Sequence, residues 1–158
     1  MTVLIISHLC YNNTIICYVL AVGAAAVAQH FGWKRLAVIY TTDTFGTDSY
    51  NLFKIWATDY DIQIVSSFSV PPGITADGNS KVSLIASLNR MKSLDALIFV
   101  FLIDDIVAAK DVWLTAFEMG VITSQTPTIG THDITSPEIW KESTEAEANR
   151  WKGIMSGL

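Results

Sequence analysis

Apolar and polar residues along the chain follow two kinds of pattern. Helical segments repeat apolar residues at intervals of three and four, whereas strand-like segments are short apolar or β-branched runs bounded by turn residues. The spacing predicts helices at residues 15–31, 47–59, 80–92 and 104–120, and strands at residues 36–40, 63–70, 95–102 and 127–130. A loop is expected at residues 71–80, a helical turn at 137–140 and a last, short strand at 151–158.

Individual residue types mark the predicted boundaries. Gly32 and Gly120 are natural helix ends, because glycine readily adopts the left-handed conformation found there. Thr47 is a candidate cap for the second helix, and Asp104 or Asp105 begins the long helix. Pro71 and its neighbour Pro72 end the strand before them, since proline cannot donate to a ladder.

The order of these elements predicts the fold class. A helix is followed three times by a strand and a helix, and then by a strand. Residues 96–101 are apolar on both faces, which is typical of a central parallel strand. We therefore expect an α/β protein with a doubly wound parallel sheet, a three-layer Rossmann-like lobe formed by residues 15–158. Residues 1–14 stay unassigned.

Composition narrows the class further. The chain has 158 residues, of which 51% are apolar and 16% charged, with a net charge of −5. It is too apolar for a disordered chain, and part of its surface is expected to meet a partner lobe. Only Lys34 and Arg35 form a basic cluster, so a nucleic-acid partner is not expected. No uninterrupted apolar run reaches the length of about 20 residues that a membrane span needs. Cys10 and Cys17 are expected to be free thiols.

Motifs for catalysis are scarce. Glycine-rich phosphate loops, a nucleophile elbow and a zinc-binding His-Glu-x-x-His helix do not occur in the sequence. Asp104 and Asp105 fit acid–base chemistry or a helix start, and the helix start is favoured. His132 with Asp133 fits a base, half of a metal site, or a hydrogen-bonding pair for a ligand. We therefore expect no enzyme, no metal and no cofactor.

Polar residues follow the predicted strands at their carboxyl ends, where open parallel sheets hold ligands. These candidates are Thr41, Thr42 and Asp43 after the first strand, Asp104 after the third, and His132 and Asp133 after the fourth. Such groups suit a small zwitterion, although each is also a common turn or cap residue.

Several segments in order resemble one family. They are residues 30–35 (HFGWKR), the strand LAVIY at 36–40, DTFG at 43–46, LNRMKSLDALI at 88–98, AFEMG at 116–120, TIGT at 128–131 and KGIM at 152–155. From Val27 to about Gly157 the chain resembles the receptor family ligand-binding region. The stretch GWKRLAVIYTTDTFGTD is most similar to metabotropic GABA-type receptors.

The resemblance implies a fold, a partner and a mechanism. The family has the type I periplasmic-binding-protein fold, in which two lobes close on a ligand. This chain would be the second lobe, with residues 152–155 as the strand returning to a missing first lobe. It implies an extracellular ligand-binding region of a class C G-protein-coupled receptor at the plasma membrane. That receptor would form a dimer and bind a small, amino-acid-like molecule.

The resemblance also implies site residues. Phe45 stands where relatives place an aromatic ring against the ligand, although it would equally pack beneath the loop. Ile103 and Thr131 stand where GABA-type receptors have aromatic residues, and this departure argues against GABA itself.

Three other hypotheses stay open: a non-binding dimerisation lobe of such a receptor, a periplasmic-type solute-binding protein, and a metal-dependent enzyme or regulatory domain on a flavodoxin-like sheet. The last would place Asp43, Asp104 and Asp105 around a metal ion.

Overall fold

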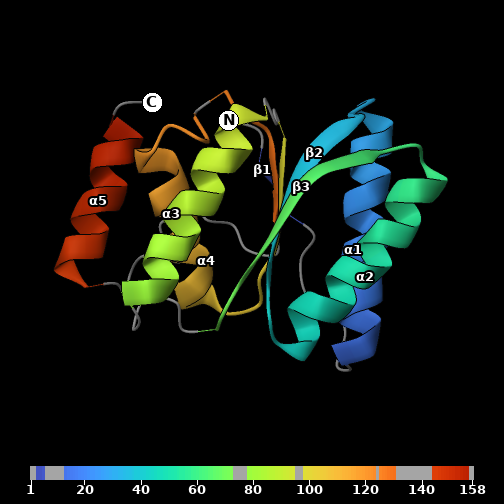
Figure 1. The fold of residues 1–158 in the computed structure, drawn as a ribbon, viewed down its shortest axis with the longest axis horizontal. Helices are drawn as coiled ribbons and strands as arrows, with labels where there is room; N and C mark the ends of the chain where they lie inside the picture. Colours follow the sequence, from blue (N-terminus) through green and yellow to red (C-terminus); the bar gives the residue numbers. More distant parts are fainter. Residues whose placement is uncertain are drawn as a thin grey trace.

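The described residues form one parallel sheet with helices on both faces (Figure 1). The computed structural model describes residues 3–5, 13–72, 78–94, 98–123, 125–130 and 144–156. In chain order the elements are β1 (Val3–Ile5), α1 (Asn13–His30), β2 (Arg35–Thr41), α2 (Thr44–Asp59), β3 (Gln63–Val70), α3 (Gly78–Ser93), β4 (Phe99–Leu102), α4 (Ile106–Glu118), β5 (Thr128–Gly130) and α5 (Glu145–Ser156). The expected α/β class with a doubly wound parallel sheet is confirmed.

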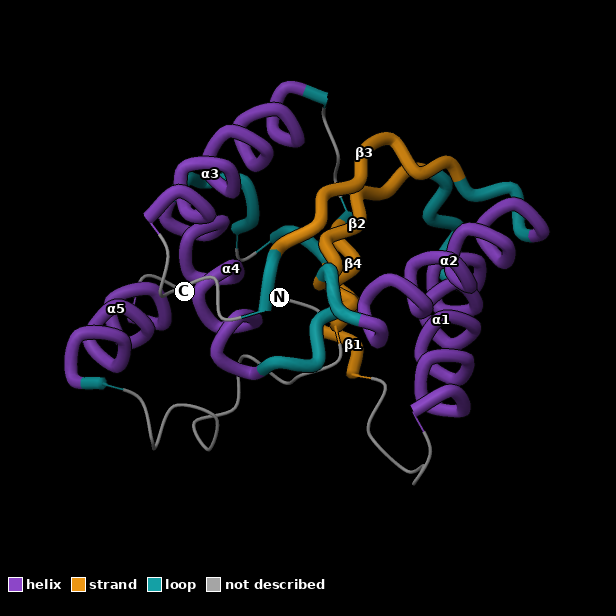
Figure 2. The backbone as a smooth tube through the Cα atoms, turned by 60° about the horizontal axis from the view of Figure 1, so that its bottom comes forward, coloured by secondary structure: helices purple, strands orange, loops and turns teal. Residues whose placement is uncertain are grey.

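The strand order is β1-β5-β4-β2-β3, and every neighbouring pair is parallel. Figure 2 shows the strands in a row between a layer with α1 and α2 and a layer with α3 and α4. Strand β2 lies between β4 and β3, with Tyr40 paired to Leu102 in β4 and to Ser69 in β3. The register of β2 against β3 shifts after Leu36, which marks a bulge.

Alternating side chains of the central strands build two cores. In β2, Leu36 and Val38 pack with α1 and α2, whereas Ala37 and Ile39 pack with α3 and α4. Burial of a central strand on both faces is the expected pattern for a parallel sheet. It explains why the sequence of β2 reads as one continuous apolar run.

The helix ends follow local chemistry. Gly32 and Gly120 adopt φ values of +67° and +62°, which confirms both as helix-ending residues. Asp105 caps α4, because its Oδ1 accepts a hydrogen bond from the Val107 amide at 2.9 Å. The predicted cap Thr47 is wrong: α2 begins at Thr44, and Asp43 caps it through the Gly46 amide.

The C-terminal segment differs most from the prediction. Residues 151–156 belong to helix α5, so the expected strand at 151–158, and the returning strand at 152–155 with it, are wrong. The stretch from Glu145 is rich in strong helix formers, and the Ala148 amide bonds to the Thr144 carbonyl at the helix start.

Two other segments also differ from the expectations. Strand β1 lies within the unassigned residues 1–14 and pairs with β5. Helix α3 begins at Gly78, inside the expected loop at 71–80. The predicted helical turn at 137–140 lies outside the described residues.

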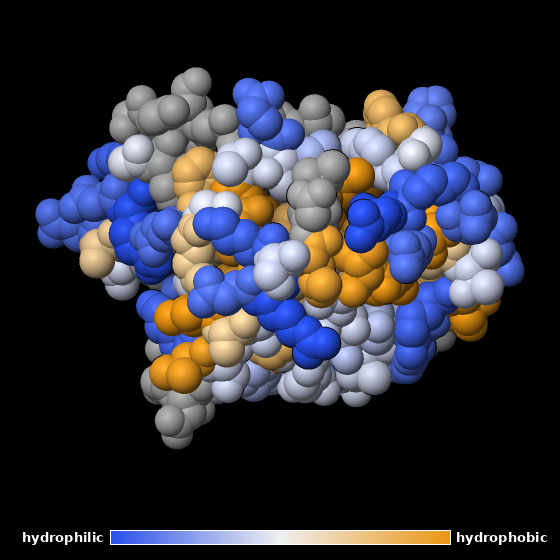
Figure 3. Space-filling model, turned by 45° about the horizontal axis from the view of Figure 1, so that its top comes forward, coloured by the Kyte–Doolittle hydropathy of each residue, from blue (hydrophilic) through white to orange (hydrophobic). Residues whose placement is uncertain are grey.

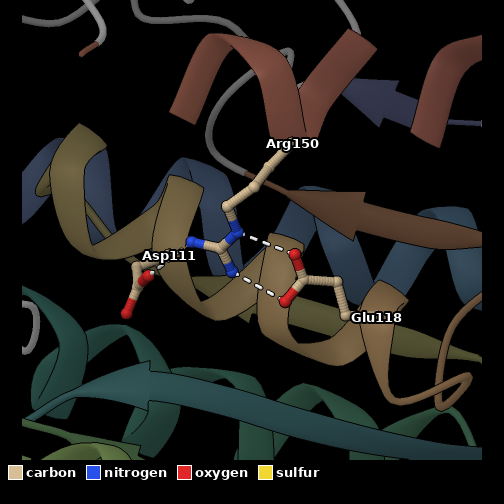
Figure 4. A network of polar contacts seen from close by, with 3 residues as sticks. All are labelled: Asp111, Glu118 and Arg150. Atoms are coloured by element: carbon tan, nitrogen blue, oxygen red, sulfur yellow. Dashed lines mark hydrogen bonds and ion pairs between the residues drawn. The ribbon is translucent and has the colours of Figure 1, made fainter. Parts of the chain in front are cut away.

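Arg150 of α5 forms ion pairs with two carboxylates of α4 (Figure 4). Its Nε and Nη2 donate to the two carboxylate oxygens of Glu118 at 2.7 and 2.8 Å. Its Nη1 lies 3.5 Å from Oδ1 of Asp111, whose side chain is only 8% exposed. A bidentate arginine–carboxylate pair is directional as well as charged, so it fixes the orientation of α5 on α4.

The ion pair changes the pKa values of both Glu118 and Arg150, and both changes favour the charged forms. The hydrogen bond from Arg150 lowers the pKa of the Glu118 carboxyl, and the same bond raises the pKa of the guanidinium. Partial burial opposes both shifts but does not reverse them.

Apolar side chains also reach the surface. Figure 3 shows hydrophobic patches between hydrophilic regions on the face in view. Exposed large apolar residues include Tyr18, Phe31, Ile55 and Val82. Among the described helices, none combines the length and the hydropathy that a membrane crossing requires. Cys17 is a free, buried thiol, and Cys10 lies outside the described residues.

We expect the variant Arg150→Ala to lower the free energy of unfolding by about 2 kcal/mol, because it leaves the buried Asp111 carboxylate without its cation. Urea unfolding followed by tryptophan fluorescence measures this change. Lys152→Ala, at an exposed position of the same helix, is the matched control and should stay within about 0.5 kcal/mol of wild type. Equal effects of the two variants would contradict the assigned role of Arg150.

The Arg150–Glu118 pair should also depend on pH. Because the folded-state pKa of Glu118 is lowered, its contribution is present above the ordinary glutamate pKa and is lost as pH falls through the folded-state value. Glu118 is partly exposed, so we expect Glu118→Gln to cost only about 0.5 kcal/mol at pH 7. The difference from wild type should shrink progressively as pH falls below the ordinary glutamate pKa, as measured by urea unfolding at pH 7 and at a series of lower pH values. A difference that stays constant throughout the series would refute this account.

Candidate functional site

The chain leaves β2 and β4 toward opposite faces at the carboxyl edge of the sheet, and the crevice of a binding site is expected between these two ends. These two strands are neighbours, yet β2 continues into α2 on one face, whereas β4 continues into α4 on the other. Helix α2 begins at the lower edge of the view in Figure 1, where β2 ends. In open α/β sheets, such a switch point is where ligands bind.

The wall on the β2 side is a compact turn. Thr41 is fully buried, and its hydroxyl donates to Oδ1 of Asp43 at 2.8 Å. The Gly46 amide donates to the same oxygen at 2.8 Å. The half-buried Asp43 carboxylate therefore serves the turn and the start of α2, whereas Thr42 between them is exposed.

Gly46 allows this turn to close. A Cβ atom at this position would meet the carbonyl oxygen and the hydroxyl of Thr41, and would lie 2.5 Å from its backbone nitrogen. Those atoms belong mostly to the backbone and cannot rotate away. Gly46 is not among the predicted site residues, although it is the one glycine in residues 41–46.

Phe45 points away from the crevice opening. It is 7% exposed and packs with Cys17, Leu20 and Leu52 between α1 and α2. The Cys17 thiol lies 3.7 Å from the Phe45 carbonyl oxygen as its hydrogen-bond donor. The sequence allowed two roles for Phe45, contact with a ligand or packing beneath the loop, and in this structure its ring packs.

The wall on the β4 side contains one buried and two polar residues. Ile103 is fully buried in the core with α3 and α4, so its side chain supports the wall from behind. Asp104 is exposed, and Asp105 is half-buried as the cap of α4. Because Tyr40 pairs with Leu102, Thr41 and Ile103 each lie one residue beyond a paired position.

Thr131, His132 and Asp133 lie outside the described residues. Strand β5 ends at Gly130, which pairs with Phe101 of β4, so the chain leaves β5 beside the β4 wall.

The described part of the crevice suits a cationic or hydroxylated ligand group. Asp104 places a carboxylate and Thr42 a hydroxyl at the exposed edge, and the described loop residues 41–43 and 103–105 include no lysine or arginine. Within the described ranges, no group of three or more His, Cys, Asp or Glu residues is arranged to hold a metal ion.

The sheet and the helices on its two faces define a Rossmann-like α/β lobe. The chain belongs to the family of the receptor family ligand binding region, whose model matches residues 14–127. No curated protein matches the sequence.

Two solved structures show the same fold. One is the solute binding protein of an ABC transporter from Rhodopseudomonas palustris BisB5 in complex with 3,4-dihydroxy benzoic acid. It has a TM-score of 0.61 and 17% identity, over 82% of this chain and 34% of that protein. The other is an ABC transporter substrate-binding protein from Desulfitobacterium hafniense in complex with Leu. It has a TM-score of 0.58 and 15% identity, over 88% of this chain and 47% of that protein. The chain thus spans between a third and a half of their length.

We expect Gly46→Ala to lower the free energy of unfolding by about 2 to 3 kcal/mol, because the added methyl group meets the Thr41 backbone. The control is Gly153→Ala in α5, where no atom lies within 4 Å of the added Cβ. That change should be neutral or stabilising by up to about 1 kcal/mol, because alanine favours helix. Urea unfolding midpoints compare the two. A Gly46→Ala protein as stable as wild type would overturn the close approach.

Proposed function

We propose that this chain is the second lobe of an extracellular ligand-binding region of a class C-type, G-protein-coupled membrane receptor. In this proposal a first lobe closes over the crevice between β2 and β4 and traps a small, amino-acid-like molecule. The family membership and the position of the crevice at the β2–β4 switch point support the proposal. The receptor would act as a dimer at the plasma membrane.

Closure would work as a population shift. A ligand that contacts both lobes binds the closed arrangement more tightly than the open one, and this difference in affinity drives the change. Some of the contacts would come from the loops after β2 and β4, and the others would come from the first lobe.

The charges of the rim favour one end of such a ligand. Asp104 would accept hydrogen bonds from an ammonium group, and Thr42 would exchange hydrogen bonds with a hydroxyl or ammonium. A ligand carboxylate would be repelled by Asp104, so the first lobe would have to hold it. The two walls would be shaped by Thr41, Asp43, Phe45 and Ile103. The loop after β5 would supply three further proposed ligand contacts, Thr131, His132 and Asp133.

A second candidate is a lobe that pairs with a partner but binds no ligand. It is favoured by the buried position of Phe45 and by Ile103 at a place where GABA-type receptors have an aromatic residue. A solute-binding protein of the periplasmic type is a third candidate, because both similar structures have that description.

The test joins the 158-residue chain to a first lobe of the same family and screens amino acids and amines at millimolar concentration by thermal shift. A ligand specific to the folded state raises the melting temperature according to RT ln(1 + [L]/Kd). We expect Asp104→Asn to weaken the binding of an amine about tenfold or more, since a charge-assisted hydrogen bond contributes about 1.5 to 3 kcal/mol.

Asp59→Asn, at the exposed end of α2, is the matched control and should leave the shift unchanged. Absence of any shift across the panel, with a folded two-lobe protein, would reject ligand binding and favour the pairing lobe.

A further inference from the structure

A second surface lies along the open edge of the sheet. Strand β3 ends the strand order and pairs only with β2 among the described strands. In Figure 1 it crosses the molecule between α3 and α2, and in Figure 2 it lies at the end of the row of strands. A groove of about 520 Å³ follows this edge, and its lining includes Tyr50, Lys54, Ser66, Ser67, Ser87 and Arg90.

The outer edge of β3 carries backbone groups for which the described residues supply no hydrogen-bond partner. The Val70 carbonyl accepts from the Thr42 amide at 2.9 Å, so the backbone groups of Val70 face β2. Successive residues of a strand direct their backbone groups to opposite sides, so those of Ser67 and Ser69 face the open edge. An unpaired row of this kind is a template for an added strand.

The two sides of the groove each carry one cation. On the α2 side, Lys54 lies 4.7 Å above the ring of Tyr50, whose hydroxyl donates to Ser67 Oγ at 2.8 Å. On the α3 side, Arg90 is exposed, and the described part of the chain contains no ion-pair partner for its guanidinium. The chain as a whole has a net charge of −5, so this cationic pair is a local feature.

We propose that the β3 edge binds an extended, acidic peptide segment of a partner protein as an additional strand. Main-chain hydrogen bonds to Ser67 and Ser69 supply the pairing, as in other cases of strand addition. Neighbouring residues of the added strand point to opposite faces of the sheet. Two consecutive acidic residues therefore reach Lys54 on one side and Arg90 on the other, in either strand direction.

The probe is a capped, fluorophore-labelled peptide of sequence Thr-Val-Thr-Glu-Glu-Thr-Val-Thr, titrated with the 158-residue chain by fluorescence polarisation. We expect Lys54→Gln and Arg90→Gln each to weaken binding about threefold to fivefold, the size expected of exposed charge pairs. Lys152→Gln, an exposed cation on α5, should change nothing. The peptide with Gln-Gln at its centre should bind about tenfold or more weakly than the Glu-Glu peptide, because it loses both contacts.

Main-chain pairing has its own readout. Peptide binding should slow hydrogen exchange at the amides of Ser67 and Ser69, while the amide of Phe68, directed toward β2, should not change. Ser69→Pro removes one outward amide and should abolish binding, as should N-methylation of alternate peptide residues.

The other possible occupants give different results. If inorganic phosphate at the same concentration as the peptide displaces it, and if the N-methylated peptide binds as tightly as the unmodified one, the groove is a small-anion site and the proposal is overturned. Concentration-dependent dimerisation of the chain that Ser69→Pro abolishes, without peptide binding, would instead assign the edge to a second copy. Binding without protection of Ser67 and Ser69 would also refute strand addition.

Discussion

The pairing of β2 with β4 is the constraint on which the rest of the molecule depends. Both strands are buried on both faces, so their alternating side chains anchor the two helix layers at once. Because the chain leaves β2 and β4 toward opposite layers, the loops after them separate and open the crevice. The candidate site and the core thus both depend on one pair of strands in register from Ala37 and Phe99 onward.

Local sequence patterns predicted those elements whose first and last residues are determined by residue types within or next to the element. The β-branched run of Gln63–Val70 is closed by Pro71, and the predicted and observed limits agree. The start of α2 was not predictable in this way, because Asp43 and Thr47 are both good capping types. The choice of Asp43 depends on the buried Thr41 hydroxyl, which only the folded turn brings to the carboxylate.

Long-range contacts explain the remaining differences. A strand is the prediction for residues 151–158. Helix α5 forms there instead, because residues 145–156 include strong helix formers and because Arg150 bonds to Glu118, which lies 32 residues earlier in the chain. The polar residues of the candidate site could be predicted, because they directly follow the strands in the sequence. The burial of Thr41, Phe45 and Ile103 depends on how α1 and α4 pack over those ends, and no spacing rule contains that information.

The contact between Gly46 and Thr41 has a mechanical consequence. Backbone meets backbone there, so no rotamer change can absorb a displacement between the end of β2 and the start of α2. Phe45, which precedes Gly46 in the first turn of α2, packs against Cys17 and Leu20 of α1. We therefore expect a displacement of this turn to move α1 and α2 together as one body, and the outer surface of both helices with them.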